Sequence, residues 1–504
     1  MAELFYPLSF VAALSGLLFW SLWHNKRAGP LFRSIFFLGM ALWIVTVISS
    51  PIEVSDKSGI ILRDLLVLGV AGLAMQWARN NLFTGVGLLI VTGLFLQLSY
   101  LEVLQDSFQP SYQVDSDAEL MVDVADDLQA FLEFIDQQGA TAKRSFSPES
   151  PESTTLDEYY TIDLKGTAKP AEIQLFVNDL LENGLADWAE TNELIRLHPE
   201  ESETTSFSTQ EMDGLVNDPE IGRQWGMKNL HIADLYETLS LKTVQPKKVA
   251  LVAILDTGVD GQHEDLTDAY QSTKSSYDRD IQGHGTHVAG IVAGVSNNGI
   301  GIASFDPAHQ FVKVTSIKVL SDRGFGTQEG IIKGMIEAAD LGADVVSMSL
   351  GGRSNADREE AYEEAVRYCN NKGTIVVVAA GNSNNNARFY APAKVDGVIA
   401  VAAIDKENAR TSFSNWVSDL KYGLAAPGDE IYSTFPGNQY RSFRGTSMAC
   451  PHVSSIVGIL KSLQPDLNTE DIFNLLNSTG IESKNPKETG MIIYPAQAVR
   501  TLLD

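Results

Sequence analysis

The stretch Val-Ala-Leu-Val-Ala-Ile-Leu-Asp-Thr-Gly, residues 249–258, is an apolar strand that runs directly into polar and glycine residues. Helical segments separate it from further apolar strands, and such alternation indicates a parallel sheet covered on both faces. The other predicted strands are Val312 to Leu320, Val345 to Met348, Thr374 to Ala380 and Val398 to Ala402. We therefore expect an α/β fold with a doubly wound parallel sheet and functional residues beyond the carboxyl ends of its strands.

Three residues that can carry chemistry stand at the ends of predicted strands or the beginnings of helices. Asp256 ends the quoted strand, His284 opens a helix of small residues, and Ser447 opens another. A serine, a histidine and an aspartate supply the nucleophile, the general base and the base-orienting carboxylate that acyl transfer requires. Taken singly, each residue could instead cap a strand or a helix.

Three longer segments surround these residues: Leu-Asp-Thr-Gly-Val-Asp (255–260), His-Gly-Thr-His-Val-Ala-Gly (284–290) and Gly-Thr-Ser-Met-Ala-Cys-Pro-His-Val (445–453). They resemble the three signature segments of subtilisin-like serine proteases and occur in the subtilisin order. The resemblance covers roughly residues 217–504 and implies a serine endopeptidase. Ser447 would attack the peptide bond, His284 would transfer the proton, and Asp256 would orient the imidazole. A second histidine, His287, would be structural, and no cofactor would take part in catalysis.

The resemblance extends to the surroundings of the scissile bond. Asn382 corresponds to a side-chain amide that binds the oxyanion, together with the Ser447 backbone N–H at a helix N-terminus. Two further segments correspond to the edges between which an extended substrate adds as a strand. We expect their glycines to leave room for the substrate backbone. The edges are Gly324, Phe325 and Gly326, and Ser349, Leu350 and Gly351.

The sequence departs from the family pattern after Asn382. Ser383 to Phe389 is shorter than the corresponding subtilisin loop, and Tyr390 falls where many relatives have glycine near the first specificity pocket. No Asp or Glu occurs from Ala379 through Tyr390, so we expect a preference for uncharged or apolar residues over Arg and Lys. Cys450 could be a redox-sensitive thiol, but a small buried residue is the favoured interpretation.

Four residues resemble parts of a calcium site of the family: Asp265, Asn298, Ile300 and Ile302. Carboxylate, amide and backbone carbonyl oxygens are the ligands that a hard cation prefers, so a structural calcium ion is expected there. The alternative is a surface turn rich in Asn.

The first hundred residues contain four apolar stretches, each near the length that spans a bilayer as a helix. We expect four transmembrane helices, because a soluble bundle of such apolar helices would lack a polar face. Basic residues between the first two stretches (Lys26, Arg27, Arg33) and between the last two (Arg79) predict cytoplasmic loops there, with the peptidase on the extracytoplasmic side. The stretches are Phe5 to Trp23, Phe32 to Ile52, Ile60 to Trp77 and Leu82 to Tyr100.

Residues 118–198 predict a small α+β domain with the order strand, helix, strand, strand, helix, strand, which is ferredoxin-like. Its last strand is expected from Asp187 to Leu197. The resemblance implies an inhibitory propeptide, with a permanent extracytoplasmic domain as the alternative. We place the membrane region at 1–104, linkers at 105–117 and 199–216, and the peptidase domain at 217–504. Self-cleavage is expected between Leu197 and Asn217.

Composition narrows the partners. Lys and Arg number 37 against 64 Asp and Glu, a net charge of -27, which argues against nucleic acid. Two cysteines cannot form a disulfide framework. The expected partners are protein or peptide substrates, the chain's own propeptide and the membrane. A non-enzymatic receptor or scaffold that only binds peptides is the competing hypothesis.

Overall fold

The computed structural model describes residues 113–165, 170–197, 200–202, 216–241, 244–354 and 359–504, with a helix at 29–49 and short helical pieces between residues 9 and 69. The chain divides into two compact units, Met1–Ser111 and Tyr112–Asp504, and each is described by itself. The second unit therefore contains both the small domain and the larger domain predicted from the sequence.

In the first unit, α2 (Gly29–Ser49) is apolar almost throughout. Its segment Gly29–Thr46 is, among the described residues, the single helix long and apolar enough to cross a membrane, judged by length and composition alone. A buried core helix or a signal sequence would also meet that test. The helix begins three residues earlier than predicted, so Arg33 lies inside it rather than in the loop before it. The fourth predicted span lies outside the described residues.

The small domain at the start of the second unit is a four-stranded antiparallel sheet in the order β3-β4-β2-β5, with two helices on one face. Alternate side chains of β2 belong to two different apolar clusters. Leu120 and Val122 pack beneath the small domain's own helices, whereas Met121 packs against the larger domain. The elements are β2 (Leu120–Val124), α5 (Leu128–Gln137), β3 (Thr141–Arg144), β4 (Tyr159–Asp163), α6 (Pro170–Glu182) and β5 (Ala186–Thr191).

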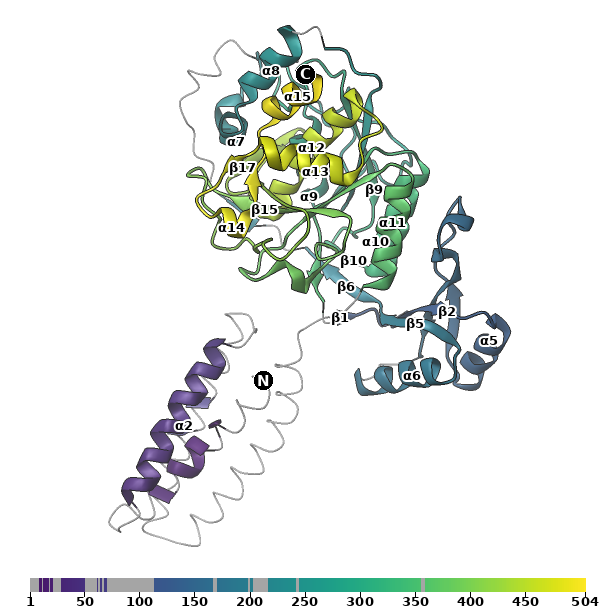
Figure 1. The fold of residues 1–504 in the computed structure, drawn as a ribbon, viewed down its shortest axis with the longest axis vertical. Helices are drawn as coiled ribbons and strands as arrows, with labels where there is room; N and C mark the ends of the chain where they lie inside the picture. The colour runs from purple at the N-terminus through teal and green to yellow at the C-terminus, as the bar shows by residue number, and fades with distance from the viewer. Residues whose placement is uncertain are drawn as a thin grey trace. The chain divides into compact units, whose positions relative to one another are not determined.

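The single strand predicted from Asp187 to Leu197 is wrong, because two strands occupy this region. β5 ends at Thr191, and β6 (Glu193–Arg196) leaves the small sheet to pair antiparallel with β1 (Gln113–Val114) and β10 (Phe325–Thr327). Asn192 makes the break, since its amide donates to the Ala118 carbonyl and its Oδ1 accepts the Glu329 N–H. Figure 1 shows β6 passing from the small domain to the side of β10.

The larger domain is built on an eight-stranded sheet in the order β19-β20-β16-β15-β13-β11-β8-β9. All its pairs are parallel except β19 with β20. The five predicted strands all lie in it, which confirms the expected parallel sheet. The strands are β8 (Ala250–Asp256), β9 (Val312–Lys318), β11 (Val345–Met348), β13 (Ile375–Ala379), β15 (Val398–Ile404), β16 (Gly423–Pro427), β19 (Ile481–Glu482) and β20 (Met491–Ile492).

Helices cover both faces of this sheet, as its apolar strands require. Val252 and Ile254 of β8 pack in a cluster with α9 and α12, while Ala253 and Leu255 pack with α10 and α11. A hairpin of β17 (Ile431–Phe435) and β18 (Gln439–Arg444) leads into α12. The helices are α7 (Trp225–Asn229), α8 (Ile232–Leu241), α9 (His284–Ala293), α10 (Gln328–Asp340), α11 (Glu360–Asn371), α12 (Thr446–Leu463), α13 (Thr469–Thr479), α14 (Pro486–Thr489) and α15 (Pro495–Leu503).

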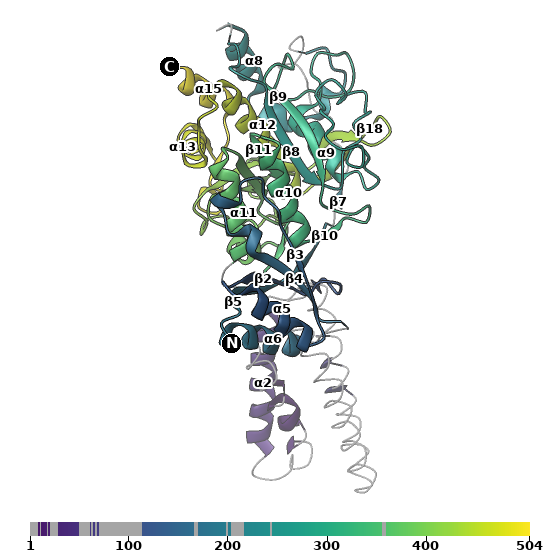
Figure 2. The same cartoon turned by 90° about the vertical axis from the view of Figure 1, so that its right-hand side faces the viewer.

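The small sheet packs on α10 and α11 (Figure 2). Met121 and Tyr159 are fully buried in the same apolar cluster as Ile332 of α10 and Val366 of α11. Polar contacts add to this packing, because Glu190 accepts the Glu360 N–H at the start of α11. The two domains of the second unit thus share a continuous buried interface.

Candidate active site

Asp256 and His284 form a buried pair. Asp256 is the last residue of β8, and His284 is the first residue of α9. The His284 Nδ1 lies 2.9 Å from both carboxylate oxygens of Asp256, and the two residues are 1% exposed or less. This geometry suits an aspartate that holds an imidazole in one orientation and leaves its Nε2 for proton transfer.

The start of α9 is fixed by its neighbours. A Cβ on Gly285 would lie 2.1 Å from the Gly258 carbonyl oxygen, so only glycine permits the helix to approach the end of β8 this closely. The Asp280 carboxylate accepts the backbone N–H groups of Gly283 and Thr286 and thereby caps the helix. Asp280 was not predicted, although an acidic residue four positions before the motif histidine is a cap signal.

The electrostatic surroundings separate the two histidines of the motif. Burial opposes protonation of His284, but the adjoining Asp256 and nearby Asp280 outweigh it and raise the pKa of His284 above its usual value. Burial lowers the pKa of His287 to about 3, and its Nε2 lies 3.0 Å from two carbonyl oxygens of the β17–β18 hairpin. His287 is therefore a neutral residue that joins α9 to this hairpin.

Ser447 is the second residue of α12 and is half-buried. Its hydroxyl donates to the Ser349 carbonyl oxygen at 3.2 Å, and the Ser349 hydroxyl donates back to the Ser447 carbonyl at 2.7 Å. Within residues 244–354 and 359–504, no hydrogen bond joins Ser447 to His284. A rotation about the Ser447 Cα–Cβ bond is the change that would redirect its hydroxyl.

The first turns of α9 and α12 lie at the same end of the two helices. His287 contacts the carbonyl of Arg441, which belongs to the strand that runs into α12. Further along, the Ser455 hydroxyl donates to the Val292 carbonyl at 2.8 Å. Ser455 lies eight positions after Ser447, and Val292 lies eight positions after His284. The contact therefore holds the two helices side by side with their first residues at the same level.

Asn382 is exposed and is oriented by Thr446. Its Oδ1 accepts hydrogen bonds from the Thr446 backbone N–H at 2.8 Å and hydroxyl at 2.9 Å. The amide nitrogen is therefore the part of Asn382 that remains for an incoming group. Thr446 is a positioning residue that the sequence interpretation missed, although it belongs to the Gly-Thr-Ser motif.

One of the two predicted cleft edges already carries a strand. β6 pairs with β10, so that Ile195 lies opposite Gly326 and Arg196 opposite Phe325. The Leu197 N–H donates to the Gly324 carbonyl oxygen at 2.7 Å. Ile195 is 1% exposed and packs in the cluster that contains Leu350 of the second edge.

The expected role of the edge glycines differs from the observed one. A Cβ on Gly324 would keep an ordinary 3.6 Å from Leu197, so the neighbouring backbone does not require glycine. Gly324 is needed because its φ is +78°, in the left-handed region. A Cβ on Gly326 would instead meet the Val319 carbonyl of its own loop at 2.3 Å.

The four residues of the expected calcium site come together in one loop region, but as hydrogen-bonding groups. The Asp265 carboxylate accepts the Asn298 amide at 2.8 Å, the Ile302 backbone N–H at 2.8 Å and the Tyr440 hydroxyl at 3.2 Å. The Asn298 Oδ1 accepts the Ile300 N–H. Asn298 and Ile302 thus present donors to Asp265, whereas a cation requires acceptors. In this arrangement the residues do not fit a calcium ion.

Cys450 is fully buried, and burial raises the pKa of its thiol to about 11. A thiol with so high a pKa stays protonated at neutral pH, in agreement with the small buried residue favoured from the sequence.

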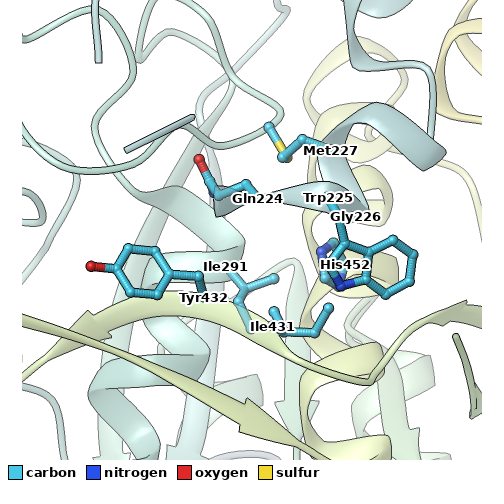
Figure 3. A pocket seen from close by; sticks show the side chains of 8 residues that line it. All are labelled: Gln224, Trp225, Gly226, Met227, Ile291, Ile431, Tyr432 and His452. Atoms are coloured by element: carbon cyan, nitrogen blue, oxygen red, sulfur yellow. The ribbon is translucent and has the colours of Figure 1, made fainter. Parts of the chain in front are cut away.

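A pocket beside the start of α7 contains none of the candidate catalytic residues (Figure 3). His452 of α12 lines it, with its Nδ1 donating to the Met448 carbonyl at 2.8 Å, and burial lowers its pKa to about 4. We assign this neutral histidine no part in the chemistry. The lining residues are Gln224, Trp225, Gly226, Met227, Ile291, Ile431, Tyr432 and His452.

Comparison with known proteins agrees with this geometry. A model of the subtilase family matches residues 247–491. Thermitase of Thermoactinomyces vulgaris is 39% identical over 252 residues, which are 49% of this chain and 85% of thermitase. Subtilisin DY of Bacillus licheniformis is 42% identical over 235 residues, 45% of this chain and 82% of that protein.

A solved structure resembles the chain as well. It is described as proteases from Pseudoalteromonas arctica PAMC 21717, is 29% identical and has a TM-score of 0.50. The match covers 57% of this chain and 99% of that one. With a matching family model and relatives named as proteases over most of their length, this chain belongs to the subtilase family of serine peptidases.

Proposed function

We propose that this chain is a serine endopeptidase in which Ser447 is the nucleophile, His284 the general base and Asp256 the carboxylate that orients it. The observation that carries the proposal is the buried Asp256–His284 pair at 2.9 Å, at the same end of α9 and α12 as Ser447. Such a pair with a serine at a helix N-terminus is the arrangement that activates a hydroxyl for acyl transfer.

The chemistry follows from these positions. After rotating toward His284, the Ser447 hydroxyl loses its proton to Nε2 as its oxygen attacks the scissile carbonyl. The negative charge that develops on the carbonyl oxygen is met by the Asn382 amide and the Ser447 backbone N–H at the N-terminus of α12. His284 then returns the proton to the leaving amine, and water repeats the sequence to release the acyl group.

We further propose that the small domain is an inhibitory propeptide that places its own chain in the substrate cleft. Ile195 and Leu197 are held along β10, as a substrate would be by β-augmentation. The next described residues, β7 (Glu200–Glu201), pair antiparallel with β18, the strand that leads into α12 and Ser447. Self-cleavage between Leu197 and Asn217 would release the peptidase once the small domain dissociates. A permanent tether is the alternative.

The test is labelling by a fluorophosphonate probe, which reacts with activated serines. Wild type that is expressed as the full chain and allowed to complete self-processing should incorporate the probe, and Ser447→Ala should not. Ser478→Ala is the matched control, because Ser478 is an exposed serine on α13, and it should label like the wild type. Failure of fully processed wild type both to label and to cut any peptide would favour the receptor or scaffold hypothesis.

We also propose that the N-terminal region anchors the peptidase in a membrane, with the catalytic domain on the extracytoplasmic side. Support comes from α2, which exposes large apolar side chains around its surface rather than a polar face. A reporter fused after Asp504 should be active only outside the cytoplasm, and a cytoplasmic signal would overturn this topology. The exposed side chains are Leu31, Phe37, Leu38, Leu42, Ile44 and Val45.

A further inference from the structure

Two arginines of β18 hold two successive glutamates of the chain's own linker. The Arg444 Nε lies 2.7 Å from the Glu200 carboxylate, and the Arg441 guanidinium pairs with the Glu201 carboxylate. Backbone pairing fixes their register, since Glu200 lies opposite Arg444 and the Ser202 N–H donates to the Ser442 carbonyl at 2.9 Å. The match of two acids with two bases is therefore part of a strand pairing and not a contact between loose side chains.

The direction of the chain places these glutamates on one side of the reaction centre. Leu197 is bound to Gly324 on the first cleft edge, and Glu200 is bound to Arg444, three residues before Ser447. With Leu197 on the first cleft edge and Glu200 on the strand that leads to Ser447, the bond offered to the nucleophile would fall between these two residues. Glu200 and Glu201 accordingly lie on the leaving-group side of the bond that faces Ser447.

Arg441 is held in position even apart from its carboxylate partner. Its guanidinium carbon lies 3.9 Å from the centre of the Phe435 ring, a stacked cation–π arrangement. Phe435 is itself held edge-on against Phe443, with ring centres 6.1 Å apart. A planar guanidinium fixed in this way loses less freedom when it binds a carboxylate than a mobile lysine would.

These two bases contrast with the charge of the whole chain. At a net charge of -27, the protein repels acidic peptides at long range. Two arginines close in sequence to the nucleophile offset that repulsion only at the substrate residues that they contact. They would therefore select for acidic residues at those substrate positions and not for acidic peptides in general.

Resting on the proposed peptidase activity, we infer that Arg441 and Arg444 determine specificity: they favour substrates with two successive acidic residues on the leaving-group side of the scissile bond. Glu200 and Glu201 occupy the position that such a substrate would take. Exposed ion pairs are weak individually, so two of them should amount to about a three- to tenfold preference in kcat/KM.

The experiment compares three peptides that differ only at the two residues that pair with β18, as Glu-Glu, Gln-Gln or Lys-Lys. Full-length protein is used, and rates are referred to the serine sites titrated with a fluorophosphonate. Wild type should cleave the Glu-Glu peptide fastest, with a preference that shrinks as salt is added. The double variant Arg441→Glu with Arg444→Glu should prefer the Lys-Lys peptide, an inversion that a merely structural role would not produce.

Arg223→Gln is the matched control, because Arg223 is also stacked on a tyrosine, at 3.9 Å, and paired with a glutamate. It should keep the wild-type order of the three peptides. Equal kcat/KM for all three with wild type would overturn the acidic preference and leave the peptidase intact. If neither wild type nor the control cleaves any peptide after complete self-processing, the peptidase proposal fails, and the preference fails with it.

Discussion

His284 is the residue whose charge decides whether the proposed reaction can begin. It must be neutral to accept the serine proton, yet Asp256 and Asp280 outweigh burial and raise its pKa above 6.5. The base is therefore lost as pH falls through this raised pKa. We therefore expect the pH profile of kcat/KM to have an acidic limb, on which kcat/KM rises with pH and whose midpoint lies above 6.5.

Asp256→Asn removes the main favourable charge and the correct tautomer together. The limb should then move to lower pH, and kcat should fall about 10⁴-fold, as for the corresponding change in a serine-protease triad. Asp268→Asn, an exposed aspartate on the same segment, should change neither. A limb that keeps its position in Asp256→Asn would contradict the role assigned to this carboxylate.

Tyr390 is the residue that we expect to limit the first specificity pocket. It is 8% exposed, pairs with Arg353 across β12 (Gly352–Arg353) and β14 (Tyr390–Ala391), and stands beside Gly381. The segment Ala379–Tyr390 contains no carboxylate, so a buried Arg or Lys side chain would have no counter-charge there.

A peptide library should be cut after uncharged or apolar residues, and Tyr390→Gly should shift the profile toward larger side chains. Arg388→Gln, an exposed neighbour paired with Asp419, should leave the profile unchanged. Cleavage mainly after Arg would show this prediction to be wrong.

At the scale of elements, the contact of β5 and β6 with α11 links inhibition to pH. Glu190 and Glu193 are almost fully buried at this contact, and burial, followed by the nearby Glu359, raises the pKa of both to about 8. Lys394 opposes the shift at Glu193 without cancelling it. Between pH 4.5 and about 8, Glu190 and Glu193 therefore keep their protons while the segment is docked and lose them when it is free.

Docking should therefore be strongest below pH 4.5 and weaken as pH rises through about 8. Gel filtration of the cut chain between pH 5 and 8 measures how much small domain stays bound. The double variant Glu190→Gln with Glu193→Gln should weaken the dependence, leaving the part due to Asp123, whose pKa burial raises to about 7, whereas Glu182→Gln on the far helix α6 should retain all of it. Retention that is equal at all pH values in wild type would count against this linkage.

The loop of Asp265 decides the question of calcium. Binding would require the Asn298 amide to turn and the carboxyl, whose pKa burial raises to about 7, to lose its proton. Because these groups do not fit a calcium ion as they stand, we predict that chelation above pH 7 leaves the melting temperature unchanged, in wild type and in Asp265→Ala alike. A melting temperature that falls by several degrees on chelation in wild type, but not in Asp265→Ala, would show instead that the loop rearranges to bind calcium.

The sequence predicted the parallel sheet, because each of its buried strands is an apolar run with a polar end. It also predicted Asp256, His284 and Ser447 as catalytic residues, because each stands in a long motif, and the structure brings Asp256 and His284 into contact. It did not predict the path of β6, because Glu193–Arg196 is too short to show a pattern and its partner lies more than a hundred residues away. The donor groups around Asp265 also depend on a folded loop that residue types alone do not specify.

At the scale of the whole molecule, our proposals combine into a peptidase whose substrate cleft would be occupied by its own chain before processing. Residues up to Leu197 contact β10, and Glu200–Glu201 pair with β18, the strand that leads to Ser447, so in the proposed mechanism the serine would meet a tethered substrate at high effective concentration. Self-cleavage would separate the membrane region and small domain from the peptidase in sequence. Release would then depend on the contacts that survive the cut, which are the buried contact of the small domain with α10 and α11 and the pairing of β6 with β10.

The most direct test of this account is the size of the chain in wild type and in Ser447→Ala, measured by mass spectrometry after expression at full length. We predict that wild type is cut between Leu197 and Asn217, while Ser447→Ala, with turnover reduced about a millionfold as reported for subtilisin, accumulates uncut. The cut peptidase should leave the membrane fraction once the small domain dissociates from it, and the uncut mutant should remain in that fraction. A wild-type chain that stays full length and is nevertheless active would contradict the account, because the segment in the cleft would then be neither substrate nor inhibitor.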